Sequence, residues 1–440
     1  MTPRDPYGYG LSTSIEAAAA YNRGLADVLR LRRGALEHIA ESIAHDPTFG
    51  LGHAALALLG HQMCAPVDVD ARLRVARIHA ARSSERERSH IHAIAAHVRG
   101  DSRPLIDHLA AYPRDALLLS AAVPTIAFAG ATTVPEESWG IVERAAPAYG
   151  DDWWFQGLLA FVRQEQMRFD EAMELSCRSL AAEPSAGHSA HARAHAHYEA
   201  GDHEAGLAWI SAWVLGAGAS IDSLSHFGWH AALHELSLGD LEAVRRRYIS
   251  QLQPGNALGC RALVDTGSLL FRWALTPGAY DVPDLAEVVG VTGTETMRHP
   301  ATPFLAMHTA IALLATGELN ALRSLQAWTA GHPHPTMRDV VSPLAAALAL
   351  LGSGQPSPAA DALAALAPGV RRLGGSRAQR EILEETRIAA LLRAERYDEA
   401  RLLLDARLDR RHSPRDERWR DQALADGRPT LLSSGRSVHS

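Results

Sequence analysis

The hydrophobic positions of this chain lie in runs rich in alanine and leucine, separated by short stretches of Gly, Asp and Pro. Strict alternation of apolar and polar residues, which is typical of strands, is missing, and β-branched residues are not enriched. The pattern therefore predicts an all-α protein in which strands are rare or absent.

One corner pattern recurs between the predicted helices: a glycine or an aromatic residue, then a carboxylate, then an alanine. The corners are Phe169-Asp170, Gly201-Asp202, Gly239-Asp240, Gly317-Glu318 and Tyr397-Asp398. Glycine reaches the positive φ that ends one helix, a carboxylate caps the next, and alanine lets two antiparallel helices approach closely. Each corner thus predicts a helical hairpin.

The spacing of these corners predicts a repeat architecture. Ala172 and Ala205 are 33 residues apart, Ala205 and Ala243 are 38 apart, and the two later gaps of 78 and 79 each fit two units. Periods near 34 are typical of tetratricopeptide repeats, which stack into an α-solenoid. We expect a tetratricopeptide-like α-solenoid over residues 1–408. The Arg-, Asp- and Ser-rich residues 409–440 are expected to form a C-terminal cap or a flexible tail.

Two histidine pairs share the same internal spacing and stand one repeat apart. His191 and His195 are four residues apart, as are His226 and His230, and the two pairs are separated by 35 residues. Equivalent positions of successive hairpins lie side by side in a solenoid. We therefore expect the four imidazoles to converge on the wall of a concave groove.

The same register extends this stripe in both directions. Its two rows are Phe161, His195, His230 and Asp265, and Gly157, His191, His226 and Arg261. His308 lies 78 residues beyond His230, and His53 lies 138 residues before His191, distances close to two and four periods. Both are candidate ligand-binding residues, and Asp265 joins the four histidines as a candidate catalytic residue.

Three more side chains are candidate ligand contacts. The carboxylate of Glu165 can complete a ligand set, and Arg272 lies seven residues after Asp265, where it can recognise a ligand or form a structural pair. Trp229 stands between two candidate histidines, where it can form a platform in the groove or pack in the core.

Two kinds of chemistry fit clustered imidazoles. Imidazole titrates near neutrality and can act as a general acid or base. Two histidines four apart on a helix, with a neighbouring carboxylate, can instead hold a divalent metal with one open position. The sequence leaves the metal unknown, because it contains no HExxH or CxxC motif. With 23 histidines in the chain, chance pairs of surface or core histidines are the ordinary alternative.

Composition narrows the classes of partner. The net charge is −7 and the arginines are dispersed, which argues against a binder of nucleic acid or of an anionic membrane surface. All 43 basic residues are arginine, which excludes Schiff-base lysine chemistry and fits a GC-rich bacterial genome. Three scattered cysteines and the absence of a leader or a long apolar run predict an unexported, cytoplasmic protein. A homo-oligomer is compatible with these features.

Several segments together resemble the tetratricopeptide repeat protein 38 family, through most of the chain. They are Leu11 to Ser14, Asp46 to His53, Gly157 to Glu165, His191 to His197, His226 to Leu233, Asp265 to Arg272 and Phe304 to His308. The resemblance implies an all-helical solenoid and brings little established biochemistry. The family often carries a carboxylate just after the second histidine motif, where this chain has Tyr198 followed by Glu199.

Three functions follow as hypotheses. The first is a solenoid that binds a small molecule or a short peptide in a histidine-rich groove. The second is an enzyme, a hydrolase or lyase, that uses the same histidines and Asp265 for acid–base or metal-assisted chemistry. The third is a scaffold for another protein, which is disfavoured because this stripe lacks the lysine and asparagine clamps of such grooves.

Overall fold

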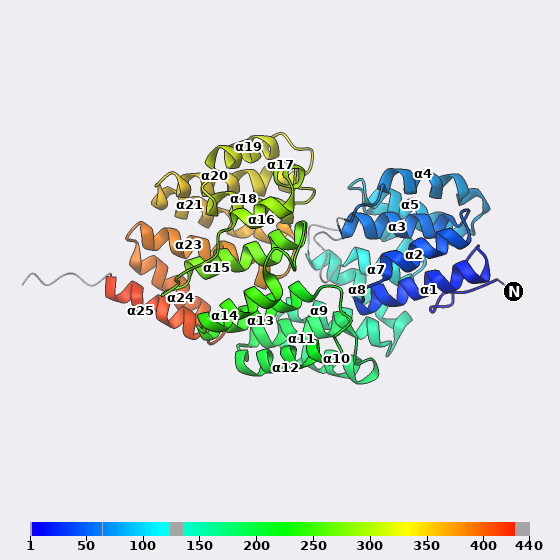
Figure 1. Cartoon of the computed structure of the whole chain (residues 1–440), viewed down its shortest axis with the longest axis horizontal. Helices are drawn as coiled ribbons and strands as arrows, with labels where there is room; N and C mark the ends of the chain where they lie inside the picture. Colours follow the sequence, from blue (N-terminus) through cyan, green and yellow to red (C-terminus); the bar gives the residue numbers. More distant parts are fainter. Residues whose placement is uncertain (1, 64, 124–134, 427–440) are drawn as a thin grey trace, which may run out of the picture.

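The computed structural model describes residues 2–63, 65–123 and 135–426 (Figure 1). Across these residues the regular structure is helical, and the only β-type pairings are two isolated bridges, Arg4 with Gly10 and Arg32 with Ile221. The all-α prediction is confirmed. No helix within the described ranges combines the length and the apolar character needed to cross a bilayer.

The first group of helices forms the lobe at the right of Figure 1. These helices are α1 (Ile15–Arg30), α2 (Ala35–His45), α3 (Gly50–Gln62), α4 (Val69–His79), η1 (Ala80–Arg82), α5 (Glu85–His97), α6 (Arg103–Ala111), α7 (Ala116–Ala122) and α8 (Pro135–Tyr149). Together with the start of the next helix they enclose one large apolar core, which runs from Tyr7 to Val162.

The second group crosses the lower part of the molecule in Figure 1. It consists of α9 (Trp153–Glu165), α10 (Phe169–Ala182), α11 (Gly187–Ala200), α12 (His203–Leu215), α13 (Leu224–Leu238), α14 (Leu241–Arg247) and the π-helical turn η2 (Tyr248–Leu252). Consecutive helices α9 and α10, α11 and α12, and α13 and α14 contact each other as hairpins.

The third group forms the lobe at the left of Figure 1. It consists of η3 (Ala262–Gly267), α15 (Ser268–Leu275), α16 (Ala286–Thr292), α17 (Thr294–Arg298), α18 (Pro303–Ala315), α19 (Leu319–Ala330), η4 (Met337–Val341), α20 (Ser342–Gly352), α21 (Pro356–Leu366), η5 (Ala367–Leu373), α22 (Arg377–Arg380), α23 (Ile382–Arg393), α24 (Tyr397–Arg410) and α25 (Pro414–Asp426). A second large apolar core spans Tyr198 to Leu383.

The corners predicted at glycines form as expected, and the corner at Phe169-Asp170 needs one correction. Gly201, Gly239 and Gly317 adopt positive φ, as expected for helix ends. At Phe169-Asp170 the positive φ belongs instead to Met167, two residues before α10 begins. Asp170 therefore lies inside the first turn and does not cap the helix, although its charge still favours that end of the dipole.

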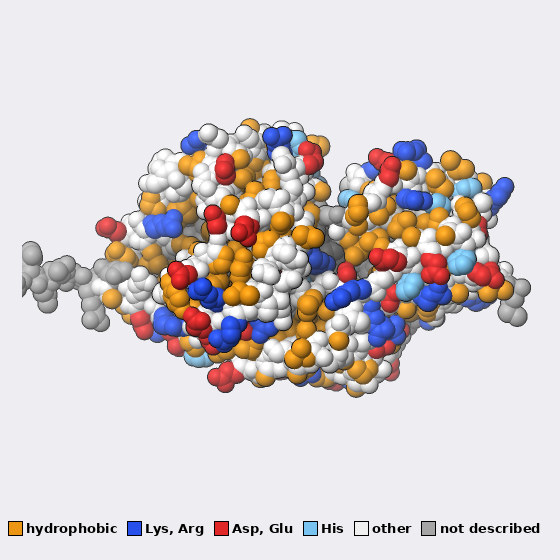
Figure 2. All heavy atoms as spheres, in the orientation of Figure 1, with side chains coloured by type: hydrophobic (Ala, Val, Ile, Leu, Met, Phe, Trp, Pro, Cys, Tyr) orange, Lys and Arg blue, Asp and Glu red, His pale blue; other side chains and the backbone are white. Residues whose placement is uncertain are grey.

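The C-terminal segment packs more firmly than a loose tail. Arg411, Arg415 and Trp419 are buried, and α25 contacts α24 and α13. Residues 409–410 complete α24 and residues up to 426 pack against the preceding helices, whereas residues 427–440 lie outside the described residues. On the face shown in Figure 2, acidic and basic side chains are intermingled, and a notch separates the two lobes.

Candidate histidine centre

Four imidazoles meet where α11 packs against α13. The ring centroids of His191 and His195, and of His195 and His230, are 4.5 Å apart, and those of His191 and His226 are 5.0 Å apart. His226 and His230 are separated by 4.9 Å. The prediction that the two pairs converge is confirmed, and the four residues are called the histidine cluster below.

Small residues allow the helices to approach closely enough for this contact. Ala190 and Ala194 are buried on α11, and Gly157 of α9 lies directly against Ser189 of α11. A Cβ at Gly157 would lie 2.2 Å from the hydroxyl oxygen of Ser189. The chain therefore needs a glycine there, and the close approach brings Phe161 of α9 onto His191 at 5.4 Å.

The carboxylate of Asp265 orients one ring of the cluster. Its Oδ1 lies 2.8 Å from Nδ1 of His226, and its Oδ2 accepts a hydrogen bond from the hydroxyl of Ser225 at 3.2 Å. Because Nδ1–H of His226 donates to the carboxylate, Nε2 of His226 presents a lone pair. That Nε2 lies 3.0 Å from Nε2 of His191.

The remaining nitrogens of the cluster lack protein partners. Nε2 of His191 and Nε2 of His195 are 3.1 Å apart. Among the described residues, nothing pairs with Nδ1 of His191, Nδ1 of His195 or either nitrogen of His230. All four side chains are only 1–2% exposed. A buried polar atom without a partner costs about 1–3 kcal/mol, so packing alone does not account for this arrangement.

The environment keeps three of these rings neutral. Burial lowers the pKa of His195 to about 3, and the nearby carboxylate of Glu165 offsets only part of this effect. Burial, together with the adjacent imidazoles, also holds the pKa values of His191 and His230 well below the ordinary value. Neutral imidazole is the form that binds metal ions.

The positions of three nitrogens suit a metal ion. One nitrogen each from His191, His195 and His230 lies within 4.8 Å of the other two. Nitrogens bound at 2.0–2.1 Å to a tetrahedral Zn²⁺ are about 3.4 Å apart. Small side-chain rotations therefore separate this arrangement from a three-histidine ligand set.

Trp229 and Glu165 lie beside the histidine cluster in structural roles. The Trp229 ring stacks on His226 at 5.6 Å, and its Nε1 donates to the hydroxyl of Ser268. Glu165 accepts from the backbone of Arg377 at 3.1 Å and pairs with the guanidinium of Arg380 at 3.3 Å. Burial alone would raise the pKa of Glu165, but the Arg380 charge and the backbone donor lower it.

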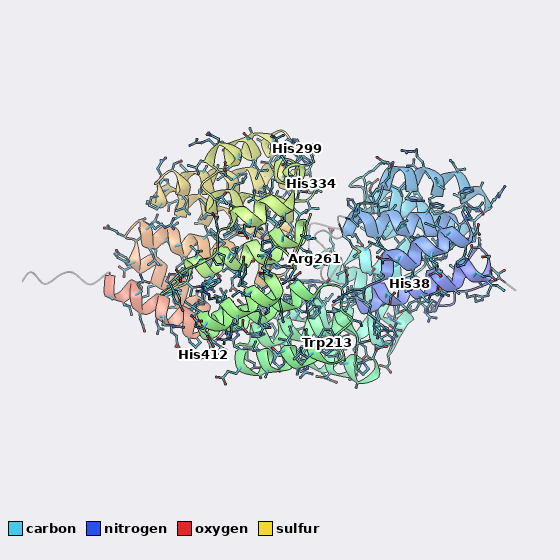
Figure 3. The ribbon with its side chains drawn as sticks, viewed as in Figure 1. His38, Trp213, Arg261, His299, His334 and His412 are labelled. Carbon is cyan, nitrogen blue, oxygen red and sulfur yellow. The ribbon has the colours of Figure 1, made fainter. Side chains whose placement is uncertain are left out.

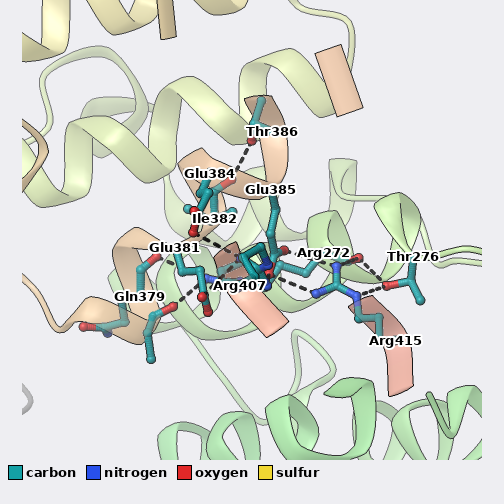
Figure 4. Close-up of polar contacts among 12 residues, drawn as sticks. Arg272, Thr276, Gln379, Glu381, Ile382, Glu384, Glu385, Thr386, Arg407 and Arg415 are labelled. Atoms are coloured by element: carbon teal, nitrogen blue, oxygen red, sulfur yellow. Dashed lines mark hydrogen bonds and ion pairs between the residues drawn. The ribbon is translucent and has the colours of Figure 1, made fainter. Parts of the chain in front are cut away.

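The two terminal nitrogens of Arg272 are held by protein partners. The residue is fully buried, pairs with Glu385 at 2.8 Å and donates to the carbonyl of Ala378 at 2.6 Å (Figure 4). The groove role predicted for Arg272 is therefore wrong, because the C-terminal helices supply its partners. His308 also lies outside the histidine cluster: it packs on Phe304 at 4.7 Å, and burial, then the Arg272 charge, lowers its pKa to about 3.

His53 is the one predicted residue in a different part of the molecule. Its Nε2 lies 3.0 Å from the carbonyl of Pro47, and its helix α3 packs against α2, α4 and α5. His53 therefore does not join the histidine cluster. Helices α3, α5, α7, α9 and α11 begin 31–37 residues apart, so the period is kept, but four hairpins separate His53 from His191. Equivalent side chains come into contact only in neighbouring hairpins.

The C-terminal segment closes over the side of the histidine cluster that was expected to be an open groove. Tyr198 donates to Glu381 at 2.9 Å, and Arg411 pairs with Glu381 and with Glu199. Arg407 adds ion pairs to Glu381 at 3.1 Å and to Glu385 at 3.3 Å (Figure 4). We call these contacts, with those of Arg272, the arginine–carboxylate network. The centre is therefore buried.

Sequence reasoning missed a second cluster of similar composition in the first lobe. Asp115 is buried and contacts Arg86, His90 and His108. Arg86 and His90 are four residues apart on α5, a weak signal that the repeat register did not include. A search against models of known protein families finds no match for the chain, so the chemistry of the centre is argued from its geometry.

Proposed function

We propose that the histidine cluster binds a divalent transition metal such as Zn²⁺ and that this centre acts on a small molecule. His191, His195 and His230 are the proposed ligands, and His226, oriented by Asp265, stands beside them. The observation that carries the proposal is the convergence of three buried imidazoles that have four ring nitrogens without a protein partner.

A cation explains this arrangement better than a hydrogen-bond network does. Neutral imidazole has one N–H and one lone pair, so rings that face each other through Nε2 cannot satisfy every nitrogen among themselves. A metal ion uses the lone pairs directly, and the imidazoles need not be protonated. Imidazole ligands suit Zn²⁺, Ni²⁺ and Cu²⁺.

The proposed ligand number favours a reactive centre over a structural one. Structural zinc sites use four protein ligands, whereas catalytic sites use three and leave one position for water or substrate. A metal held by His191, His195 and His230 would supply a water activated near neutrality, and an imidazole held by a carboxylate would accept the proton. His226, paired with Asp265 at 2.8 Å, is the proposed proton acceptor, which supports hydrolase or lyase chemistry.

A metal-free acid–base site is the second candidate. The contact between Asp265 and His226 is the carboxylate–imidazole pair that general-base catalysis requires. A chelator distinguishes the two, because it removes a metal-dependent activity and leaves a metal-free one intact.

We also propose that the hairpins belong to a tetratricopeptide-like superhelix related to the tetratricopeptide repeat protein 38 family. The contacts of α9 with α10 and of α11 with both α9 and α10 support this proposal, together with the 35-residue register of the histidines. The buried position of the histidine cluster favours a small molecule over a docked protein as the ligand.

Metal content tests the proposal directly. The full chain, stripped with a chelator and titrated with Zn²⁺ in a calorimeter, should bind about one equivalent at the centre. His195→Gln and His230→Gln should each weaken that binding by at least 100-fold. Circular dichroism melts of the metal-free proteins should change little, because the lost nitrogens have few protein partners.

His188→Gln is the matched control. His188 is buried on the same helix and lies near the carbonyl of Val28 at 3.3 Å, outside the three-nitrogen set. This variant should bind Zn²⁺ like the unmodified chain. Equal binding by all four proteins, or none by the unmodified chain, would remove the metal centre from consideration.

A further inference from the structure

A polar cavity lies beside the histidine cluster, where the first lobe meets α13. Its volume is about 280 Å³, close to the lower end of small-molecule pockets. The side chains that matter most for its chemistry are Arg33, Asp222, Ser225, Gln251, Asn256 and Arg261. Figure 3 labels Arg261 near the centre of the molecule, between the lobes of Figure 1. We call this space the arginine pocket.

One wall of the arginine pocket is fixed by backbone pairing between distant segments. The amide of Arg33 donates to the carbonyl of Ser220 at 3.2 Å, and the amide of Asp222 donates to the carbonyl of Leu31 at 2.9 Å. Nε of Arg33 donates to the carbonyl of Ile221 at 3.2 Å. These contacts hold Arg33 and Asp222 in place without a ligand, so the pocket is preformed.

The pocket carries an excess of positive charge. Two guanidinium groups, those of Arg33 and Arg261, face a single carboxylate, that of Asp222. Arg261 forms no hydrogen bond with any residue in the described ranges, although the attraction between its charge and Asp222 is appreciable. Its five N–H donors are therefore available, and a guanidinium with free donors is suited to a carboxylate or a phosphate.

The pocket reaches the histidine cluster through three consecutive contacts. Ser225 lines the pocket, and its hydroxyl donates to Oδ2 of Asp265 at 3.2 Å. Oδ1 of Asp265 holds Nδ1 of His226 at 2.8 Å, and Nε2 of His226 lies 3.0 Å from Nε2 of His191. A ligand in the pocket thus lies one side chain away from the carboxylate that orients the centre.

We infer that the arginine pocket binds the anionic group of the small molecule on which the metal centre acts, and that this group is a carboxylate or a phosphate. Arg261 is the principal contact, Arg33 the second, and Asp222 a negative charge that limits affinity. The assignment of the anion as part of a substrate rests on the proposed function. The binding of an anion in the pocket stands on the cavity and its charges.

Calorimetric titration of the full chain tests the inference, with inorganic phosphate and succinate as separate probes. At least one probe should bind, and the stronger of the two identifies the oxyanion class. Arg261→Gln should weaken that binding by at least tenfold. Asp222→Asn should strengthen it several-fold, because it removes the opposing charge, an effect that a purely structural role of the loop would not produce.

Arg246→Gln is the charge-matched control, since Arg246 is exposed on α14 and does not line the pocket. It should bind the probe as the unmodified chain does. Equal losses in the Arg246 and Arg261 variants would show a general charge effect and overturn the inference. Failure of both probes to bind the unmodified chain would overturn it as well.

Titration of the probes into metal-free and Zn²⁺-loaded protein separates this inference from the proposed function. Binding that depends on Arg261 in a chain that takes up no Zn²⁺ would keep the anion site and end the metal proposal. Zn²⁺ binding without any anion binding would do the reverse. Anion affinity that rises when Zn²⁺ is bound would support the coupling through Asp265.

Discussion

The two histidine–carboxylate clusters of this molecule use the same residue types in opposite ways. In the first lobe, Oδ2 of Asp115 lies 2.8 Å from Arg86, 2.7 Å from His90 and 3.1 Å from His108. One carboxylate oxygen therefore collects three partners, one of them a permanent cation. In the histidine cluster, by contrast, Asp265 contacts a single imidazole and a hydroxyl, and most of the rings face each other.

Distance alone does not separate the two clusters, because both bring three nitrogen or oxygen atoms within 4.8 Å. The difference lies in how charge and hydrogen bonds are satisfied. Arg86 already neutralises Asp115 and would repel a metal ion, so that cluster is a structural junction. Within the described residues, the histidine cluster has no such cation in contact and keeps four ring nitrogens without partners, whereas the first cluster leaves only Nε2 of His90 without one.

Removing the carboxylate charge at Asp115 should have the largest effect on stability and tests whether the first cluster is structural. Asp115→Asn leaves the Arg86 guanidinium buried without its counter-ion, which should cost about 3–5 kcal/mol of unfolding free energy. Urea unfolding measures the loss. Zn²⁺ stoichiometry at the histidine centre should stay the same, because the two clusters share no residue.

Asp107→Asn provides the reference for an exposed carboxylate. Asp107 pairs with Arg103 on the surface of α6, and its loss should change stability by less than about 0.5 kcal/mol. A small effect of Asp115→Asn, comparable with this reference, would contradict the structural reading of the first cluster. Loss of Zn²⁺ binding in the Asp115 variant would indicate that the metal binds at Asp115 and not at the histidine cluster.

Asp265→Asn tests the role of the carboxylate in the histidine cluster, and its expected effect is of intermediate size. The amide keeps the shape of the carboxylate but not its charge, so the ring of His226 becomes less firmly oriented. Loss of such an outer partner typically weakens metal affinity by about 10–100-fold. Competition with a chromophoric Zn²⁺ chelator measures this change.

Thr266→Val is the matched control on the same π-helical turn. The Thr266 hydroxyl donates to the carbonyl of Leu252 at 2.5 Å, a residue outside the histidine cluster. Its loss should affect stability more than Zn²⁺ affinity. If Asp265→Asn and Thr266→Val weaken the metal equally, the carboxylate has no specific role.

His97 shows what burial does to a histidine outside both clusters and carries the smallest expected effect. Burial, then the neighbouring His61, lowers its pKa from 6.5 to about 4. Between these pH values the unfolded chain binds more protons. The contribution of His97 to stability is therefore full above pH 6.5 and declines as the pH falls toward 4.

His97→Gln should consequently reduce the loss of stability between pH 7 and pH 5 by about 1–2 kcal/mol. The glutamine can keep the contact with the Ser102 hydroxyl, which lies 2.7 Å from Nδ1 of His97. Urea unfolding of the metal-free chain at both pH values is the measurement. An unchanged difference between the two pH values would mean that His97 is not neutral in the fold.

The sequence alone located the histidine cluster because helical hairpins of similar length preserve register. His191 and His226 are 35 residues apart and meet through their Nε2 atoms. The register is off by one helical turn at Asp265. This residue contacts His226, whereas the spacing placed it in the same row as His230. Asp265 lies on the π-helical turn η3, whose wider turn rotates its side chains relative to an α-helix.

What periodicity could not predict are the contacts between segments far apart in the chain. Arg272 pairs with Glu385, 113 residues later, and Tyr198 with Glu381, 183 residues later. These pairs arise because the chain folds back on itself, an event that leaves no repeat in the sequence. For the same reason Arg272 was expected in an open groove and is instead enclosed.

Because the C-terminal helices pack back on earlier ones, these contacts form late during synthesis. α9 and α11 leave the ribosome well before the residues from Arg377 to Arg411, which contact Glu165 and Tyr198 on these helices. A nascent chain can therefore take up an ion before its last helices dock. If the proposed ion is bound in the finished protein, its exchange would require local opening of those helices, so the rate of exchange should report how often they open.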